Sequence, residues 1–259
     1  MESVKIVKIG GNVIDSPEAF ASFMAEFAKL EGKKILVHGG GKIATRFAKQ
    51  MEVETVMIEG RRVTDRAMLD IVTMTYAGLI NKNVIATLQK EGCNAIGLSG
   101  ADGNALKATK RPVAPIDFGF VGDINPADVN AEFLMTLLNV GVTPVFSAIM
   151  HNGEGDLLNC NADTVASSVA LGMSRVAKTD LIFCFEKKGV LTDINDDASV
   201  IKTITPENYA SFKADGAIHS GMIPKIDGAL KAVSQGVKSV TIKHSEDLLD
   251  AEAGTKIEA

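Results

Sequence analysis

Lys8 and two runs of glycine are the residues of this sequence best suited to chemistry on an anion. Lys8 lies in the apolar run 4–9, and Gly10 and Gly11 follow that run directly. A second apolar run, 35–37, is followed by His38-Gly39-Gly40-Gly41-Lys42. Because glycine has no Cβ, its backbone N–H groups can approach a phosphate closely, and a helix that begins there adds partial positive charge. The two turns together predict an anion-binding cradle.

Other interpretations compete with this one. The Gly-Lys pairs of the chain do not fit the G-x-x-x-x-G-K-[ST] pattern of a Walker A loop, which excludes ordinary P-loop chemistry. A dinucleotide-binding fingerprint is harder to exclude, because Gly39-x-Gly41-x-x-Ala44 fits a loose G-x-G-x-x-G/A, and Glu59 follows about eighteen residues later. A nicotinamide fold would not require Lys8 and its glycines. Tight turns that bind nothing are the simplest interpretation, and all three stay open at this point.

Short β-branched runs alternate with longer segments of helical period, which predicts βαβ units and an α/β fold with a mainly parallel sheet covered by helices on each side. In such a sheet ligands bind beyond the carboxyl ends of the strands, where both glycine turns fall. The expected strands are residues 4–9, 35–37, 95–98, 144–149, 181–185 and 239–243, and the first expected helices are 18–30 and 42–50.

Two Pro-containing segments predict helix starts, because an N-cap side chain precedes a proline at the first helical position in Ser16-Pro17 and Asn125-Pro126. Residues 107–126 are rich in Gly, Pro and β-formers without helical period, which predicts a hairpin or excursion from the main sheet. We expect one domain, 1–259, with a substrate lobe over 1–175 and a nucleotide lobe over 176–259 that share one sheet.

Composition narrows the class of protein. The 259 residues are 46% apolar and 23% charged, and no apolar run is long enough for a membrane span. The start lacks a signal peptide, so we expect a cytoplasmic protein. The formal charge of −5, scattered basic residues and the absence of Trp argue against nucleic acid as a partner.

The cysteines and histidines suggest no metal site. Cys93, Cys160 and Cys184 are odd in number and far apart, so we expect small core residues instead of disulfides or zinc ligands. His38 is expected to be structural, and the other three histidines form no ligand pattern.

Seven segments of the chain resemble the amino acid kinase family. They are, in order, IVKIGGN, LVHGGGK, GRRVTD (60–65), GLSGADGN (97–104), VGDINP (121–126), LLNCNAD (157–163) and GMIPKI (221–226). The third, fourth and sixth are similar to the acylglutamate branch of that family, and the similarity runs nearly end to end. It implies the amino acid kinase-like fold, a three-layer αβα sandwich.

The resemblance implies that ATP phosphorylates the side-chain carboxylate of N-acetyl-L-glutamate in arginine biosynthesis. A carboxylate with a pKa near ~4 is already anionic at neutral pH and needs no general base. The protein must then position donor and acceptor and offset the repulsion between anions. Magnesium is expected to arrive on ATP, with no metal site of the protein's own.

The resemblance also implies which residues take part in catalysis. Lys8 would lie along the phosphoryl path, Lys225 would reach it from the first turn of a helix, and Asp163 would orient both lysines. Simpler explanations exist for two of them. Lys225 could be a solvated helix lysine, and Asp163 an acid favoured by the dipole of its helix.

On the substrate side, Gly40 and Gly41 match the turn that contacts substrate, and Asn159 matches an amide that bonds it near its α-carbon. Arg62 is expected to clamp the α-carboxylate of the substrate. Adjacent residues of an extended segment point to opposite faces, so only one of Arg61 and Arg62 can do so, and Arg62 directly precedes Val-Thr-Asp.

The nucleotide side departs from the family pattern. Many relatives carry a short hydroxyl residue, Asp and an apolar residue before a glycine, where this chain reads Phe185-Glu186-Lys187-Lys188-Gly189. Glu186 could replace the Asp, and the two lysines could face solvent or approach phosphates. The residues that the resemblance implies for nucleotide binding are Gly11, Asn161, Glu186, Gly189, His219 and Gly221.

Several alternatives stay open. The departure allows a family member that only binds its ligand, and a sibling kinase of carbamate, aspartate, glutamate or a nucleotide is a further reading. The acyl group could be succinyl instead of acetyl, with a cationic partner supplied by the excursion 107–123. Arginine-inhibited relatives usually have an extra N-terminal helix, which this chain lacks before its first strand. We therefore expect an arginine-insensitive homodimer that associates through helices of the substrate lobe.

Overall fold

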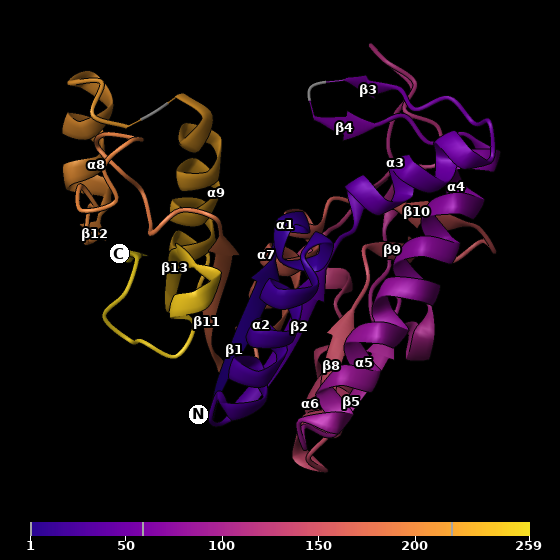
Figure 1. Cartoon of the computed structure of the whole chain (residues 1–259), viewed down its shortest axis with the longest axis horizontal. Coiled ribbons are helices and arrows are strands. Elements are labelled where there is room, and N and C mark those ends of the chain that lie inside the picture. The colour runs from indigo at the N-terminus through magenta and orange to yellow at the C-terminus, as the bar shows by residue number, and fades with distance from the viewer. Residues whose placement is uncertain (1, 59, 219) are drawn as a thin grey trace.

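The computed structural model describes residues 2–58, 60–218 and 220–259. Its centre is an eight-stranded sheet in the order β12-β14-β13-β11-β1-β2-β8-β5 (Figure 1). Neighbouring strands run parallel except β13 and β14, so the predicted mainly parallel sheet is confirmed. The strands are β1 (Ser3–Ile9), β2 (Lys33–His38), β5 (Ala95–Leu98), β8 (Thr143–Phe146), β11 (Lys178–Phe185), β12 (Thr203–Ile204), β13 (Ser239–His244) and β14 (Thr255–Ile257).

Helices lie on both sides of this sheet and complete the three layers. On one side α7 packs against β1 and β11 and contacts α9, which packs against β13. On the other side α2 and α5 contact each other (Figure 1). The helices are α1 (Gly11–Asp15), α2 (Pro17–Lys29), α3 (Gly41–Gln50), α4 (Arg66–Val72), α5 (Asn81–Lys90), α6 (Ala131–Asn139), α7 (Ala162–Met173), α8 (Pro206–Ala214) and α9 (Ile223–Ser234).

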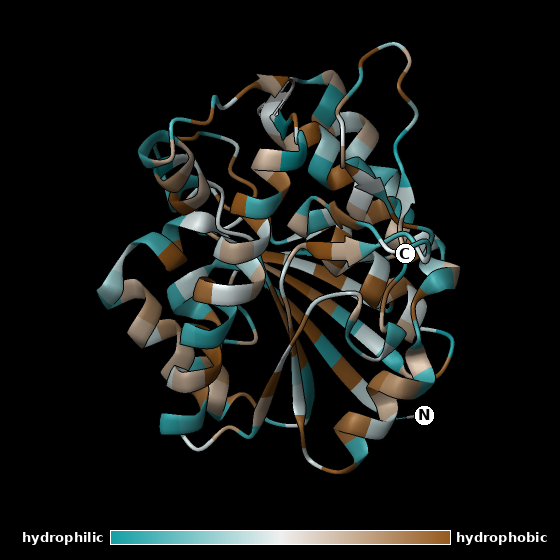
Figure 2. Ribbon diagram, turned by 90° about the vertical axis from the view of Figure 1, so that its right-hand side faces the viewer, coloured by the Kyte–Doolittle hydropathy of each residue, from teal (hydrophilic) through white to brown (hydrophobic). Residues whose placement is uncertain are grey.

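The core lies between these layers. Successive side chains of β1 alternate between the two faces, yet Val4, Ile6, Val7 and Ile9 are all fully buried, because helices cover both faces. Figure 2 shows the hydrophobic colour concentrated on the central strands and the hydrophilic colour on the outer surfaces of the helices. No helix within the described ranges is long and apolar enough to span a membrane.

Three short hairpins stand apart from the sheet. They pair β3 (Met57–Ile58) with β4 (Arg61–Arg62), β6 (Thr109–Lys110) with β7 (Gly122–Asp123), and β9 (Ile149–His151) with β10 (Leu157–Asn159). The second of them confirms the excursion predicted over 107–126. The π-helical segment Thr73–Ile80, which joins α4 to α5, has no counterpart in the sequence-based expectations.

Two predicted boundaries are wrong. The strand expected over 144–149 ends at Phe146, because the chain then leaves the sheet and Ile149 begins a separate hairpin. Asn125 caps only a short 3-10 turn, Pro126–Asp128, and the helix α6 begins later, where the side chain of Asn130 accepts a hydrogen bond from Phe133 N at 3.1 Å. The other predicted start is confirmed, since Ser16 caps α2 by accepting from Ala19 N.

Candidate active site

The two glycine turns lie side by side at the carboxyl ends of β1 and β2. Ile9 and His38 are register partners at the last residues of these neighbouring parallel strands, so the chain turns out of the sheet at the same edge twice. Gly11 begins α1 and Gly41 begins α3. Gly40 adopts a φ of +154°, and a Cβ there would lie 2.1 Å from Ile80 Cδ1, so glycine is required at this position.

Lys8 and Asp163 meet at this edge. Lys8 in β1 is a register partner of Phe183 in β11. Helix α7 packs against both of these strands and carries Asp163 in its first turn. Lys8 Nζ lies 2.7 Å from Asp163 Oδ1, and Lys8 is only 8% exposed. The predicted orienting carboxylate is therefore paired with one of the two predicted catalytic lysines.

Lys225 approaches the same place from α9, where Pro224 occupies the first turn as predicted. Its Nζ lies 3.5 Å from the ring centroid of Phe185, and Lys8 Nζ lies 5.2 Å from the same centroid. Burial lowers the pKa of Lys225; Asp163 opposes that shift, Lys8 adds to it and Glu186 opposes it. No pattern in the sequence indicates that Phe185 would face both lysines.

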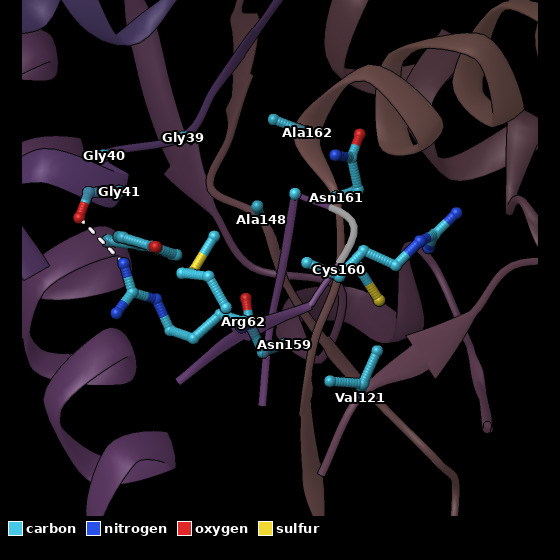
Figure 3. A pocket seen from close by; sticks show the side chains of 14 residues that line it. Gly39, Gly40, Gly41, Arg62, Val121, Ala148, Asn159, Cys160, Asn161 and Ala162 are labelled. Carbon is cyan, nitrogen blue, oxygen red and sulfur yellow. Dashed lines mark hydrogen bonds between the residues drawn. The ribbon is translucent and has the colours of Figure 1, made fainter. Parts of the chain in front are cut away.

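Arg62 lines a neighbouring cavity of about 190 Å³. Its Nη2 donates to Gly41 O at 3.0 Å and to Thr45 Oγ1 at 2.8 Å, so the guanidinium is fixed against the start of α3 (Figure 3). Arg62 is 7% exposed, and within the described ranges it has no carboxylate partner. A buried guanidinium that lacks a counter-ion is suited to a carboxylate from a ligand.

Further predicted substrate residues line the same cavity. Asn159 donates through Nδ2 to Thr64 Oγ1 at 3.0 Å, which fixes its amide and leaves its carbonyl oxygen available as an acceptor. Gly40 and Gly41 form the opposite wall (Figure 3). Arg61 also lines this cavity, although its side chain is exposed where that of Arg62 is buried, as the alternation along β4 predicts.

A larger groove of about 670 Å³ lies between α7 and α9. Asp163, Phe185, Gly221 and Lys225 line it, and it shares Gly60, Arg61 and Asn161 with the cavity of Arg62. The two hollows therefore meet at these three residues, next to Asp163, the partner of Lys8. This arrangement can hold one anion at Arg62 and a second, larger one in the groove, which Lys225 lines together with Asp163, the partner of Lys8.

The remaining residues predicted for nucleotide binding are distributed unevenly. Asn161 caps α7 by accepting from Asp163 N and Thr164 N, and Glu186 is exposed. Gly189 is buried, and a Cβ there would lie 2.8 Å from Thr255 Oγ1, which gives this glycine a packing role. His219 lies outside the described residues, as does Glu59 of the dinucleotide-type fingerprint.

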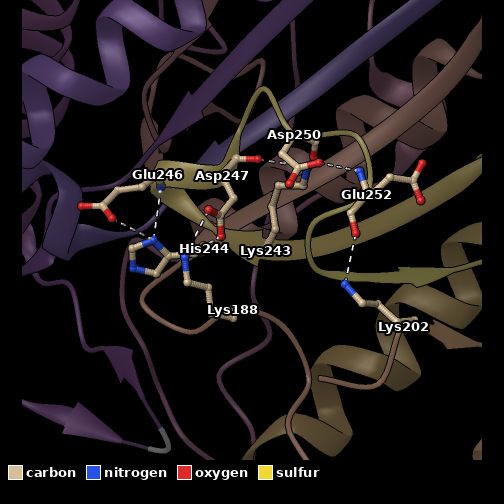
Figure 4. Close-up of polar contacts among 8 residues, drawn as sticks. All are labelled: Lys188, Lys202, Lys243, His244, Glu246, Asp247, Asp250 and Glu252. Carbon is tan, nitrogen blue, oxygen red and sulfur yellow. Dashed lines mark hydrogen bonds and ion pairs between the residues drawn. The ribbon is translucent and has the colours of Figure 1, made fainter. Parts of the chain in front are cut away.

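Lys187 and Lys188, in the segment that departs from the family pattern, both form contacts within the protein. Lys188 Nζ lies 3.0 Å from Asp247 Oδ2, and Lys187 Nζ donates to Ile194 O at 3.0 Å. Figure 4 shows Lys188 beside Asp247, next to the buried Lys243. These contacts draw both lysines away from the groove, so we expect them to contribute little to phosphate binding.

His38 and the cysteines have structural surroundings, as predicted. His38 is fully buried between Gly39 O, 2.9 Å from Nδ1, and Asn81 Nδ2, 3.0 Å from Nε2, and burial lowers its pKa to about 4. The imidazole is therefore neutral near pH 7. All three cysteines are buried and free, and burial raises the pKa of Cys160 and of Cys184 to about 12.

Several features fit a phosphotransferase: the three-layer fold, the glycine turns at the carboxyl ends of β1 and β2, and the two lysines that face Phe185. The chain belongs to the amino acid kinase family, whose sequence profile matches residues 3–244. It is similar to the acetylglutamate kinase of Cytophaga hutchinsonii, with 50% identity over 251 residues that cover 96% of this chain and 94% of that protein. The acetylglutamate kinase of Phocaeicola vulgatus is 48% identical over 93% of each chain.

A solved structure gives the same result for the fold. The crystal structure of smu.665 from Streptococcus mutans UA159 matches with a TM-score of 0.78 and 28% identity, covering 99% of this chain and 98% of that one. Membership of a kinase family decides against the dinucleotide-binding interpretation of Gly39 to Ala44. The predicted resemblance and the predicted fold class are both confirmed.

Proposed function

We propose that the protein acts as an ATP-dependent acetylglutamate kinase, phosphorylating the side-chain carboxylate of N-acetyl-L-glutamate in arginine biosynthesis. An oxygen of that carboxylate attacks the γ-phosphorus of ATP. The bond from this phosphorus to the bridging oxygen breaks, and ADP leaves with the electron pair of the broken bond. The product is an acyl phosphate, and no proton needs to be removed from the attacking group.

We assign substrate binding and charge stabilisation to different side chains. Arg62, held by Gly41 O and Thr45, binds the α-carboxylate, and Asn159 accepts from the acyl amide N–H. Lys8 and Lys225 stabilise the charge on the transferring phosphoryl group, and Asp163 holds Lys8 in place. The groove suits a nucleotide because its volume of about 670 Å³ exceeds that of the Arg62 cavity and because Lys225 lines it.

The observation that carries the proposal is the convergence of Lys8 and Lys225 on the ring of Phe185, with Asp163 paired to Lys8 on the wall of the groove. We expect Lys8→Ala to lower kcat about 100- to 1,000-fold with little change in KM, because the ammonium acts mainly in the transition state. Acyl phosphate trapped with hydroxylamine measures the reaction. Lys5→Ala, on the same strand but at its other end, is the matched control and should retain wild-type kcat.

A panel of acceptors separates this proposal from its alternatives. N-Acetyl-L-glutamate should be turned over, and free L-glutamate, aspartate and carbamate should not. Turnover of one of the latter alone would indicate a sibling kinase. ATP binding without turnover of any acceptor would indicate a family member that only binds its ligand.

Magnesium belongs to the proposal as a companion of ATP. Mg²⁺ keeps most of its shell as water and phosphate oxygen, so its charge would be added to those of the two lysines at the phosphates. The cytoplasmic location expected from the sequence stays a prediction, which cell fractionation would test.

The homodimer is also part of the proposal. Met51, Met74 and Leu79 of the substrate lobe are 54%, 53% and 43% exposed. With Phe47 and Ile71 they line an apolar hollow of about 220 Å³ on the outer surface of α3 and the helical segments after it. Burying such a patch against a second copy would remove apolar surface from water.

A further inference from the structure

The Lys225 ammonium lies over the ring of Phe185 and has no ion-pair partner among the described residues. Its Nζ is 3.5 Å from the ring centroid. The carboxylate of Asp163 is paired with Lys8, 2.7 Å away, and not with Lys225. A lysine side chain is flexible, so it needs a contact near its end to stay in one place. For Lys225 that contact is an aromatic ring.

A second ring supports Phe185. Phe183 comes two residues earlier in β11 and therefore points to the same face of the sheet. The two rings stack, with centroids 5.9 Å apart and planes inclined by 13°. Phe183 is buried, and both rings line the groove between α7 and α9. The ring that meets Lys225 thus rests on a buried neighbour in the sheet.

The same ring also attracts Lys8. Lys8 Nζ lies 5.2 Å from the centroid of Phe185, within the ~6 Å over which a ring attracts a cation. Two ammonium groups so placed repel each other, and Lys8 accordingly lowers the pKa of Lys225. A ring that attracts both cations offsets part of this repulsion.

A ring holds a cation differently from a carboxylate. A carboxylate neutralises the ammonium and occupies its N–H donors with strong hydrogen bonds. A ring attracts the ammonium through its quadrupole and leaves the net charge unchanged. The donors that point away from the ring stay available to phosphate oxygens. A lysine that must act on an anion is therefore better fixed by Phe185 than by a second acid.

We propose that Phe185 is a positioning residue for phosphoryl transfer, whose ring orients the Lys225 ammonium beside Lys8 and leaves its full charge for the transferring phosphoryl group. This inference rests on the proposed kinase function and adds a residue to it. The main rival is a packing role, in which the ring only fills the wall of the groove.

The test replaces Phe185 with phenylalanines that carry one, two or three ring fluorines. Fluorine withdraws charge from the ring face with little change in size, so the attraction to a cation weakens while the apolar contact stays. We expect kcat to fall with each fluorine, by about 2- to 30-fold for the trifluoro ring. KM for N-acetyl-L-glutamate should not change, because Phe185 lines the groove and not the cavity of Arg62.

A second readout does not depend on activity. An NMR titration of protein labelled at the lysine ε carbons reports the pKa of Lys225, and Lys225→Arg assigns its signal. The ring favours the charged form of this lysine, so its pKa should fall with each fluorine. Asp163 of α7, Lys8 of β1 and Glu186 after β11 also act on Lys225, and they are the same in every variant. A packing role would leave this pKa unchanged.

Phe183 provides the matched control. It lies in the same strand and in the same stack, but the rings that both lysines contact are that of Phe185 alone within the described ranges. The same fluorinated residues at Phe183 should leave kcat within about twofold of wild type and should not move the pKa of Lys225. Denaturation curves check that every variant is folded.

Each contrary outcome overturns the inference in a recognisable way. If fluorination of Phe185 changes neither kcat nor the pKa of Lys225, the ring only packs. If that pKa falls and kcat stays, the contact exists but does not serve the reaction. If fluorination of Phe183 has the same effects, the cause is the stack as a whole. In these three cases the proposed function stands. If wild type phosphorylates no acceptor, the proposed function fails and the inference fails with it.

Discussion

Phe185 begins the segment that the sequence predicts to depart from the family pattern, and it lies against both lysines. Its ring centroid lies 3.5 Å from Lys225 Nζ and 5.2 Å from Lys8 Nζ. A ring attracts ammonium groups by about 0.5 to 2 kcal/mol and excludes water around them. The departure that the sequence placed on the nucleotide side therefore reaches the two lysines that we propose to be catalytic.

The surroundings of Lys225 predict a pH dependence. Because its folded-state pKa is lowered, mainly by burial, the ammonium loses its proton below the ordinary value of 10.5. We expect kcat/KM for ATP to fall as pH rises through this lowered pKa, since the free enzyme then lacks one cation. A pH profile of kcat/KM measures the alkaline limb.

Two variants check the assignment of that limb. Glu186→Gln removes a charge that raises the pKa of Lys225, so the limb should move to lower pH. Lys225→Arg should move the limb out of range, because a guanidinium stays charged above pH 12. A limb that stays in place in both variants would assign the titration to another group.

The end of helix α2 is fixed to strand β2 by a buried lysine. Lys34 Nζ donates to three carbonyl oxygens at the end of the helix, Phe27 O at 2.6 Å, Ala28 O at 2.8 Å and Leu30 O at 2.7 Å. The last carbonyls of a helix have no partner within it, and a positive charge there also complements the helix dipole. Lys34 thus joins two elements without a role in catalysis.

Replacing this lysine should destabilise the fold and spare the chemistry. We expect Lys34→Met to lower the free energy of unfolding by about 2 kcal/mol, because buried carbonyls lose a charged donor. Urea denaturation measures the change, and kcat of the folded enzyme should stay the same. Lys33→Met, which breaks a more exposed pair with Glu2, should cost less than about 1 kcal/mol. Equal losses in the two variants would refute the role of Lys34.

For the molecule as a whole, the apolar patch on the substrate lobe predicts association. Met74→Glu places a charge in the proposed interface and should shift the dimer to monomer by at least tenfold in Kd. Sedimentation velocity measures the change. Val140→Glu, at an exposed apolar residue outside this patch, is the control and should leave the dimer intact. A hexamer, or a dimer unaffected by Met74→Glu, would contradict the proposed interface.

The continuous sheet joins the two halves of the reaction. β1 of the expected substrate lobe pairs with β11 of the expected nucleotide lobe over seven residues, Ser3↔Lys178 to Ile9↔Cys184. Lys8 therefore reaches the lobe boundary from one side and Phe185 from the other. The division at residue 175 falls between α7 and β11, and it stays a proposal.

The sequence by itself determined the features that local patterns encode. Alternation and helical period predicted the parallel sheet, and the glycines predicted the two turns. The alternation of an extended segment indicated that only one of Arg61 and Arg62 would enter the site, and the motif Val-Thr-Asp that follows selected Arg62. Motif resemblance added Lys225 and Asp163. Boundaries were missed where a cap such as Asn125 was followed by a turn too short for a helix.

Only the tertiary structure decided which side chains share a space. It placed Phe185 against two lysines, gave Gly189 a packing role, engaged Lys188 with Asp247 and brought Arg61 to the junction of both hollows. None of these contacts has a signal in sequence spacing. Periodicity reports the local backbone, whereas contacts between distant segments depend on strand order, register and helix packing, which are set when the whole core assembles.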